Sequence, residues 1–279
     1  MGTLYVVGTP IGNLEDITLR AARVLGEVSL VAAEDTRVSR RLLSHLGVRV
    51  PMVSCNEHNW QQRLPELLKS LSEGDVALVT DAGMPGVSDP GAPIVSAVTE
   101  EGFPVQVIPG PSAVTAALAV SGMPADAFLF LGFLPRRRKE RRERLARVAA
   151  IRETLVAFEA PHRLRDVLSD LLQTLGDRNI AVCRELTKLH EEVWRGSVSG
   201  ALEYFDTPRG EFVLGVAGAE DSGDSGQLTD PEVARKQLAS LRQSGSRARD
   251  AVAQVTAATG LPRSEVYRLW LETSGDSAG

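Results

Sequence analysis

The chain has 279 residues, which is more than one ordinary domain and enough for two domains with a small appendage. Its 31 lysine and arginine residues against 36 aspartate and glutamate residues give a net charge of −5, which excludes a nucleic-acid binder that is basic throughout but allows a local basic patch. The apolar runs are too short to span a membrane, and no basic segment precedes the first of them as in a signal peptide. Two cysteines are too few for a disulfide framework or a cysteine-rich zinc site. We therefore expect a cytoplasmic protein without metal or membrane contacts.

Short apolar runs alternate with helical patterns along the first half of the chain. Strands are predicted at residues 4–7, 28–33, 75–80 and 104–108, and helices at 17–25, 37–46, 64–71, 92–99 and 112–120. This alternation is typical of a mostly parallel sheet that is covered by helices on both faces. We therefore expect an α/β domain over residues 1–122.

A second series of strands and helices begins near Ala127. Strands are predicted at 127–133, 154–158, 180–184, 191–195 and 211–217, and helices at 136–150 and 160–175. We expect a second α/β domain over 123–218 and, because the residues that follow are small, polar and acidic, a linker over 219–229. The remainder, 230–279, predicts a small helical domain with a break at residues 260–262 and a disordered end.

Three segments rich in glycine and proline follow predicted strands of the first domain. They are GTPIGNLED (8–16), TDAGMPGVSDPG (80–91) and PGPSAVTAALAVSG (109–122), and none is a Walker A loop or a dinucleotide fingerprint. Many residues with special backbone conformations at strand ends favour loops that approach a ligand. Ordinary turns and a helix cap at Ser112 are the simpler alternatives.

Charged residues lie in three further segments, AAEDTRVSRR (32–41), FEAPHR (158–163) and RELTKLHEE (184–192). Glu34 and Asp35 follow a predicted strand at its carboxyl end, where ligand clefts of α/β sheets lie, although Asp35 is equally suited to cap the next helix. The charged residues of the other two segments are either site groups or members of ion-pair networks.

One segment of the second domain is strongly basic. Residues 136–147, RRRKERRERLAR, contain eight basic and two acidic side chains, and the tail from Arg235 to Arg268 contains seven and two. A solvated helix face is the usual reason for such a run, and contact with RNA phosphates is the alternative. The RNA-binding candidates are Arg136, Arg137, Arg138, Lys139, Arg141 and Arg142.

Together these segments, with GTPIGNLEDITLRA, EDTR, TDAGMPGVSDPG, PGPSAVTAAL, FEAPHRL and RELTK in this order, resemble the small-subunit ribosomal RNA methyltransferases of the tetrapyrrole-methylase superfamily. The tail, VAQVTAATGLPRSEVYRLWL, is similar to the helix-turn-helix domain that ends those chains. The resemblance implies a two-domain tetrapyrrole-methylase-like α/β fold with a small C-terminal helical domain, S-adenosylmethionine as methyl donor, and a homodimer. It also implies the 2′-hydroxyl of a decoding-centre cytidine in 16S rRNA as the acceptor.

The resemblance further implies a donor pocket between the two α/β domains. Its residues would be Pro10, Asp81, Ala82, Gly83, Val87, Ser112, Ala113, Phe158, Glu159 and, as a looser assignment, Leu186. The chain has Asp81-Ala82-Gly83 where tetrapyrrole C-methylases have Gly-Gly-Asp, which argues against a tetrapyrrole substrate.

A ribose hydroxyl is a poor nucleophile at neutral pH, so its proton must be removed or steered, unless positioning alone suffices. The candidates for this role are Glu34, Asp35, Glu185 and Lys188, the last only if burial or neighbours lower its pKa. Two rival functions remain. The first is a tetrapyrrole C-methyltransferase, which would not need the basic segment or the helical tail. The second is a non-catalytic nucleic-acid-binding regulator, which would not need the glycine-rich loops.

Overall fold

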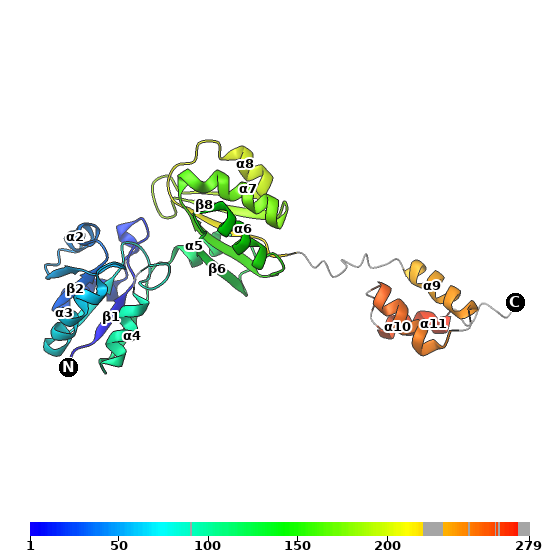
Figure 1. Ribbon diagram of the computed structural model, residues 1–279, viewed down its shortest axis with the longest axis horizontal. Coiled ribbons are helices and arrows are strands. Elements are labelled where there is room, and N and C mark those ends of the chain that lie inside the picture. Colours follow the sequence, from blue (N-terminus) through cyan, green and yellow to red (C-terminus); the bar gives the residue numbers. More distant parts are fainter. Residues whose placement is uncertain (90, 220–230, 245, 260, 262, 273–279) are drawn as a thin grey trace. The chain divides into compact units, whose positions relative to one another are not determined.

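The computed structural model describes residues 1–89, 91–219, 231–244, 246–259, 261 and 263–272 (Figure 1). The chain forms two compact units, Met1–Gly218 and Ala219–Gly279. The predicted linker at 219–229 and the predicted disordered end fall almost entirely outside the described residues.

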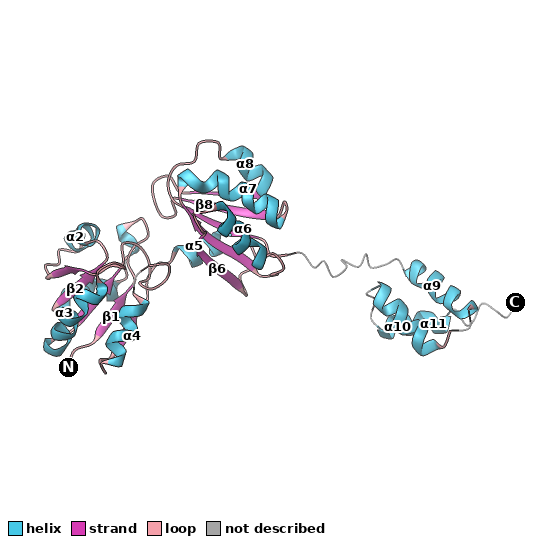
Figure 2. Ribbon diagram, viewed as in Figure 1, coloured by secondary structure: helices cyan, strands magenta, loops and turns pink. Residues whose placement is uncertain are grey.

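The first sheet is entirely parallel, with strand order β3-β2-β4-β1-β5. Its strands are β1 (Leu4–Val7), β2 (Leu30–Ala33), β3 (Met52–Ser54), β4 (Val76–Val79) and β5 (Val105–Ile108). One face packs on α1 (Leu19–Glu27) and α2 (Thr36–His45), and the other on α3 (Trp60–Glu73) and α4 (Ala92–Glu100), so strands and helices alternate as in Figure 2. Because β2 and β4 are buried on both faces, they are continuously apolar. The three-residue strand β3 was not predicted, because it is too short to show a pattern.

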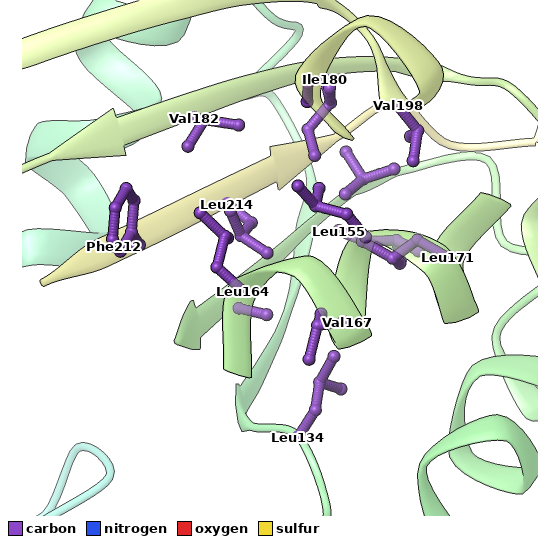
Figure 3. Close-up of a cluster of buried hydrophobic side chains, with 14 of the residues drawn as sticks. Leu134, Leu155, Leu164, Val167, Leu171, Ile180, Val182, Val198, Phe212 and Leu214 are labelled. Carbon is purple, nitrogen blue, oxygen red and sulfur yellow. The ribbon is translucent and has the colours of Figure 1, made fainter. Parts of the chain in front are cut away.

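The second sheet has the order β6-β7-β10-β8-β9, and only its β6/β7 pair is parallel. Its strands are β6 (Phe128–Phe133), β7 (Thr154–Glu159), β8 (Asn179–Arg184), β9 (Glu192–Ser197) and β10 (Phe212–Val216). On one face lie α6 (Arg138–Arg147), α7 (Leu164–Leu175) and α8 (Val198–Tyr204), of which α8 was not predicted. Figure 3 shows Leu164, Val167 and Leu171 of α7 against Leu155 and Leu214 of the sheet.

The opposite face of the second sheet is covered by α5 (Ala113–Ser121). Val114, Ala117 and Leu118 of this helix share a core with Val156 and Val213. The helix is therefore packed on the second sheet, although its residues lie within the range expected for the first domain. The polypeptide passes from one sheet to the other at Pro109–Ser112, just ahead of α5.

The described residues of the C-terminal unit form the helices α9 (Pro231–Gln243), α10 (Ala248–Thr259) and α11 (Arg263–Glu272). Its core contains the side chains that the apolar spacing predicted, namely Leu238, Val252, Val255, Val266, Leu269 and Trp270, with Leu241 packed against them. The guanidinium of Arg242 lies 4.4 Å from the ring centre of Trp270. In the part of the chain that the structure describes, no helix is both long and apolar enough to cross a bilayer.

Candidate functional site

The loops after β1 and β4 are joined by backbone hydrogen bonds. The amide of Thr9 donates to Gly83 O at 2.9 Å, the amide of Gly83 donates to Thr9 O at 3.1 Å, and the Thr9 hydroxyl donates to Thr80 O at 3.1 Å. Gly83 has φ +84°, a conformation that favours glycine. The two strands are neighbours in the sheet, so their carboxyl ends bring the two loops together.

The loops after β1 and β5 cross at two glycines. A Cβ on Gly110 would lie 2.9 Å from the backbone C, Cα and O of Gly8, which is closer than real Cβ contacts. Only glycine fits where two backbones approach this closely. The three glycine-rich segments thus form one continuous wall.

A cavity of about 610 Å³ lies between this wall and the second sheet, within the size range of small-molecule sites. All of the predicted donor-pocket residues except Pro10 line it, and Pro10 is buried directly before the lining residue Ile11. The residues that the structure brings together are Asp81, Ala82, Gly83, Val87, Ser112, Ala113, Phe158, Glu159 and Leu186. His162 of the segment FEAPHR also lines the cavity, and further lining residues that were not predicted from the sequence include Met84, Asp89, Phe133, Glu211 and Phe212.

Glu159 is the most buried carboxylate that lines the cavity. Its Oε1 accepts a hydrogen bond from the amide of Ala160 at 2.9 Å and lies 3.3 Å from Nε of Arg163, while its buried Oε2 has no hydrogen-bond partner among the described residues. Burial raises the pKa of Glu159, because the charged form is poorly solvated there. A buried oxygen without a partner in a cavity wall is suited to accept an N–H or O–H of a ligand.

Three carboxylates, Glu34, Asp81 and Asp89, line the first-sheet side of the cavity. Oε2 of Glu34 accepts from the Thr80 hydroxyl at 2.6 Å and from the Asp81 amide at 3.3 Å. Burial, together with the negative charge of Glu34, raises the pKa of Asp89 to about 6. Asp89 was missed, although it lies in the same glycine-rich segment as Asp81.

Asp35 has the capping role that was its alternative. Its side chain accepts from the Arg37 amide at 2.8 Å as the N-cap of α2 and pairs with the Arg37 guanidinium. The hydrogen bonds from Arg37 lower the pKa of Asp35 to about 2. A carboxylate with so low a pKa is a weak base, and its side chain is committed to the helix end.

Lys188 and Glu185 form an ion-pair network with Glu211. The Lys188 ammonium donates to Glu185 at 3.0 Å and to Glu211 at 2.7 Å. Burial acts to lower the pKa of Lys188, but the hydrogen bonds to these two carboxylates outweigh it and raise that pKa. The condition under which Lys188 could be a base is therefore not met, because the ammonium stays protonated.

The predicted RNA-binding residues do not all face solvent. Arg136, Arg137, Arg138 and Lys139 are exposed, but Arg141 is 3% exposed and points at the fully buried Asp170. The Asp170 carboxylate lies 2.6 Å from Nη2 of Arg141, and it also accepts from Nε of Arg138 at 3.0 Å and of Arg142 at 2.7 Å. The prediction that Arg141 contacts an RNA phosphate is wrong, because this side chain is buried and anchors α6 to α7.

The sequence profile of the Tetrapyrrole (Corrin/Porphyrin) Methylases matches residues 3–201. The chain belongs to this family. Within it, the chain is similar to proteins called ribosomal RNA small subunit methyltransferase I: one from Synechocystis is 45% identical and covers 99% of this chain and 100% of its own length. A protein of the same name from Thermotoga maritima is 48% identical over 223 residues, which are 79% of this chain and 100% of that protein. The resemblance to this branch of the family is confirmed.

Solved structures of tetrapyrrole methylases share the fold. Uroporphyrin-III C-methyl transferase from Thermus thermophilus, complexed with S-adenyl homocysteine, has a TM-score of 0.57 at 21% identity and covers 78% of this chain and 97% of its own. The methyltransferase CobJ has a TM-score of 0.60 at 19% identity, with 78% and 95% covered. The predicted α/β fold of tetrapyrrole methylases, with C-terminal helices, is confirmed.

Proposed function

We propose that this chain uses S-adenosylmethionine to methylate the 2′-hydroxyl of a cytidine in 16S rRNA. The observation that carries the proposal is similarity over nearly the whole chain to small-subunit rRNA methyltransferases, at 40–45% identity, joined to a cavity lined by the predicted donor residues. Identity to the tetrapyrrole enzymes of known structure is far lower, at 19–22%. The rRNA is therefore favoured over a tetrapyrrole as the acceptor.

The cavity has the chemistry that the donor requires. Phe158, Leu186 and Val87 offer apolar surface for an adenine ring, and the unpartnered oxygen of Glu159 can accept one of the donor's N–H groups. When bound, S-adenosylmethionine supplies a methyl carbon that is made electrophilic by the sulfonium. The part of this chain is to hold the ribose hydroxyl in line with that carbon and to receive its proton.

Asp89 is the carboxylate best suited to receive this proton. With a pKa of about 6, Asp89 is ionised at neutral pH and is a stronger base than an ordinary aspartate. A general base works best when its pKa lies near the working pH. Glu34 is the second candidate in the cavity, but it already accepts hydrogen bonds from Thr80 and Asp81. The proton would pass from the hydroxyl oxygen to the Asp89 carboxylate as the oxygen bonds to the methyl carbon, and the methyl–sulfur bond of the donor would break to leave a neutral thioether.

Methyl transfer measured with radiolabelled donor tests the function. The acceptors are assembled small ribosomal subunits, naked 16S rRNA and a tetrapyrrole, followed by mapping of the modified nucleotide by mass spectrometry. We expect a 2′-O-methylcytidine in the rRNA. Donor binding with transfer to the tetrapyrrole alone would favour the C-methyltransferase, and the absence of both donor binding and transfer would favour the non-catalytic regulator.

We also propose that the exposed basic side chains from Arg136 to Lys139 bind RNA phosphates, that the acceptor is the rRNA of the small subunit, and that the chain acts in the cytoplasm as a homodimer. Reversing Arg137 and Lys139 to Glu should weaken RNA binding and reduce the slope of log K against log salt by about 0.7–0.9 for each lost phosphate contact. The matched control reverses Arg20 and Lys69, which are exposed on α1 and α3. An unchanged slope in the first variant would show that the basic segment is only a solvated helix face.

The proposed homodimer is tested by analytical ultracentrifugation, in which we expect the mass of two chains.

A further inference from the structure

Phe133 is an exposed aromatic side chain at the cavity. It lines the cavity, yet 57% of its surface remains accessible. Exposed single apolar residues are common, but this one forms part of the wall of a ligand site. Its position is the product of a specific irregularity in the strand.

A one-residue bulge directs Phe133 toward the cavity. In the pairing of β6 with β7, Phe130 lies opposite Val156 and Phe133 lies opposite Phe158. Between these two pairs β6 advances by three residues and β7 by only two, so β6 contains one extra residue. The bulge contains Gly132, whose φ of +65° suits glycine. In a regular strand, residues 130 and 133 would face opposite sides of the sheet, and the extra residue places them on the same side.

The three phenylalanine rings consequently form one cluster. Phe158 contacts Phe130 with ring centres 5.0 Å apart and Phe133 with ring centres 5.5 Å apart, both edge to face. Phe130 and Phe158 are half-buried, so Phe133 is the member of the cluster that offers the most free ring surface. Its ring packs on Phe158, which in turn packs on Phe130, and this contact reduces the entropy lost when a flat ligand stacks on Phe133.

The chain turns directly from this ring into its basic segment. Arg136 is three residues away, which is at most about 10 Å of extended chain, and Arg137, Arg138 and Lys139 follow. Asp170 holds three arginines of this segment with a single negative charge, so the surface keeps a positive excess. A flat ring beside a fixed group of cations matches the chemistry of a single-stranded nucleic acid, which offers a base to stack and phosphates to pair.

We infer that Phe133 is the stacking platform for an unpaired nucleobase of the RNA strand that enters the cavity, with the phosphates beside that base held by the exposed cations of residues 136–139. The inference rests on the proposed function and adds how the acceptor nucleotide is held. A base displaced from its helix needs a new stacking partner, because unstacking costs free energy. In this site Phe133 supplies it, and the ribose of that nucleotide then lies at the cavity.

The test compares Phe133→Ala with Phe133→Trp and with the control Phe128→Ala, which removes an exposed ring at the other end of β6. Donor affinity is measured by calorimetry, and KM and kcat are measured with small ribosomal subunits. Phe133→Ala should raise KM about tenfold or more and leave donor affinity within twofold, because a stacked base contributes about ten- to hundredfold in affinity. Phe133→Trp should restore KM, and Phe128→Ala should not change it.

Two results would overturn the platform: an unchanged KM in Phe133→Ala, or a loss of donor affinity in that variant with RNA binding intact, which would make Phe133 part of the donor pocket. Failure of the proposed function has a different signature, since the wild-type enzyme itself would then transfer no methyl group to RNA. In that event, binding of a short single-stranded RNA to wild type and Phe133→Ala still decides the platform. Equal affinity for the two proteins would refute it.

Discussion

Asp170 offers the sharpest test of the structure, because one fully buried carboxylate holds three arginines. Arg141 is almost as buried as its partner, with Nη2 2.6 Å from the carboxylate, while Arg138 and Arg142 are 61% and 39% exposed. Replacing Asp170 by Asn leaves the Arg141 charge buried without a counter-charge. Such a change costs about 3–5 kcal/mol, and the two exposed pairs add at most about 1 kcal/mol each.

We therefore expect Asp170→Asn to lose about 4 kcal/mol of unfolding free energy, or about 8–16 °C in Tm for a unit of this size. The measurement is denaturant unfolding followed by circular dichroism, with calorimetry for Tm. The control is Asp166→Asn, which removes an exposed carboxylate from the first turn of the same helix and should cost less than about 1 kcal/mol. Equal losses in the two variants would refute the buried ion pair.

The pH dependence gives a second readout of the same cluster. Burial acts to raise the pKa of Asp170, but the hydrogen bonds from Arg142, Arg138 and Arg141 outweigh it, and that pKa is lowered from 3.8. A lowered carboxyl pKa stabilises the folded state above pH 3.8, and the stabilisation is lost as the pH falls through the folded-state value. The difference between wild type and Asp170→Asn should therefore close in acid. Replacing both Asp170 and Arg141 by apolar residues should recover part of the loss, because no buried charge is left.

Three other predictions concern the cavity and the tail. The pKa of Asp89 is raised to about 6, so the protonated carboxyl stabilises the folded state fully below pH 3.8, and this stabilisation is lost as the pH rises through 6. At pH 7 the Asp89→Asn variant should therefore be more stable than wild type. The expected gain in unfolding free energy is about 1 kcal/mol, after allowance for the partial exposure of Asp89. The same variant should lower kcat by a factor of about 10² or more at neutral pH. Gly110→Ala should lose about 1–3 kcal/mol of stability and weaken donor binding, because its Cβ meets the backbone of Gly8. Truncation after Asp224 should preserve donor binding and the proposed dimer, since the Thermotoga maritima relative aligns over its whole length with 79% of this chain. It should raise KM for small subunits, because the basic side chains of the tail can no longer contact RNA phosphates.

Each of these outcomes has a matched measurement that can contradict it. A pH–rate profile in which Asp89→Asn keeps the wild-type kcat would remove this carboxylate from proton transfer. The control for Gly110→Ala is Gly26→Ala on α1, where the added Cβ would meet only Val48, at 3.6 Å. Both variants are compared by thermal unfolding and by donor titration. Equal effects of the two substitutions would contradict the close contact between the loops after β1 and β5. Unchanged KM in the truncated enzyme, with only a lower Tm, would make the C-terminal unit a structural brace.

The sequence by itself determined the alternation of strands and helices and the glycine-rich loops at strand ends. Both are local properties: continuous apolar runs read as buried strands, and parallel strands place all their carboxyl ends at one edge. That geometry is why the glycine-rich segments that contain Asp81 and Ser112 could be expected to lie together. Glu159 ends a strand of the second sheet, and only the family resemblance placed it in the same pocket. The core of the C-terminal unit followed in the same way from helical spacing.

The tertiary structure alone decided the features that depend on distant partners. Arg141 belongs to a basic run that looks uniformly solvated, and only the packing of α6 on α7 turns it onto Asp170. Lys188 keeps its proton because Glu211, 23 residues away, lies beside it. The bulge at Gly132 reverses the face of Phe133, since strand register is fixed by pairing with β7. These contacts join residues that no local pattern relates, and each changes the chemical role of its residue.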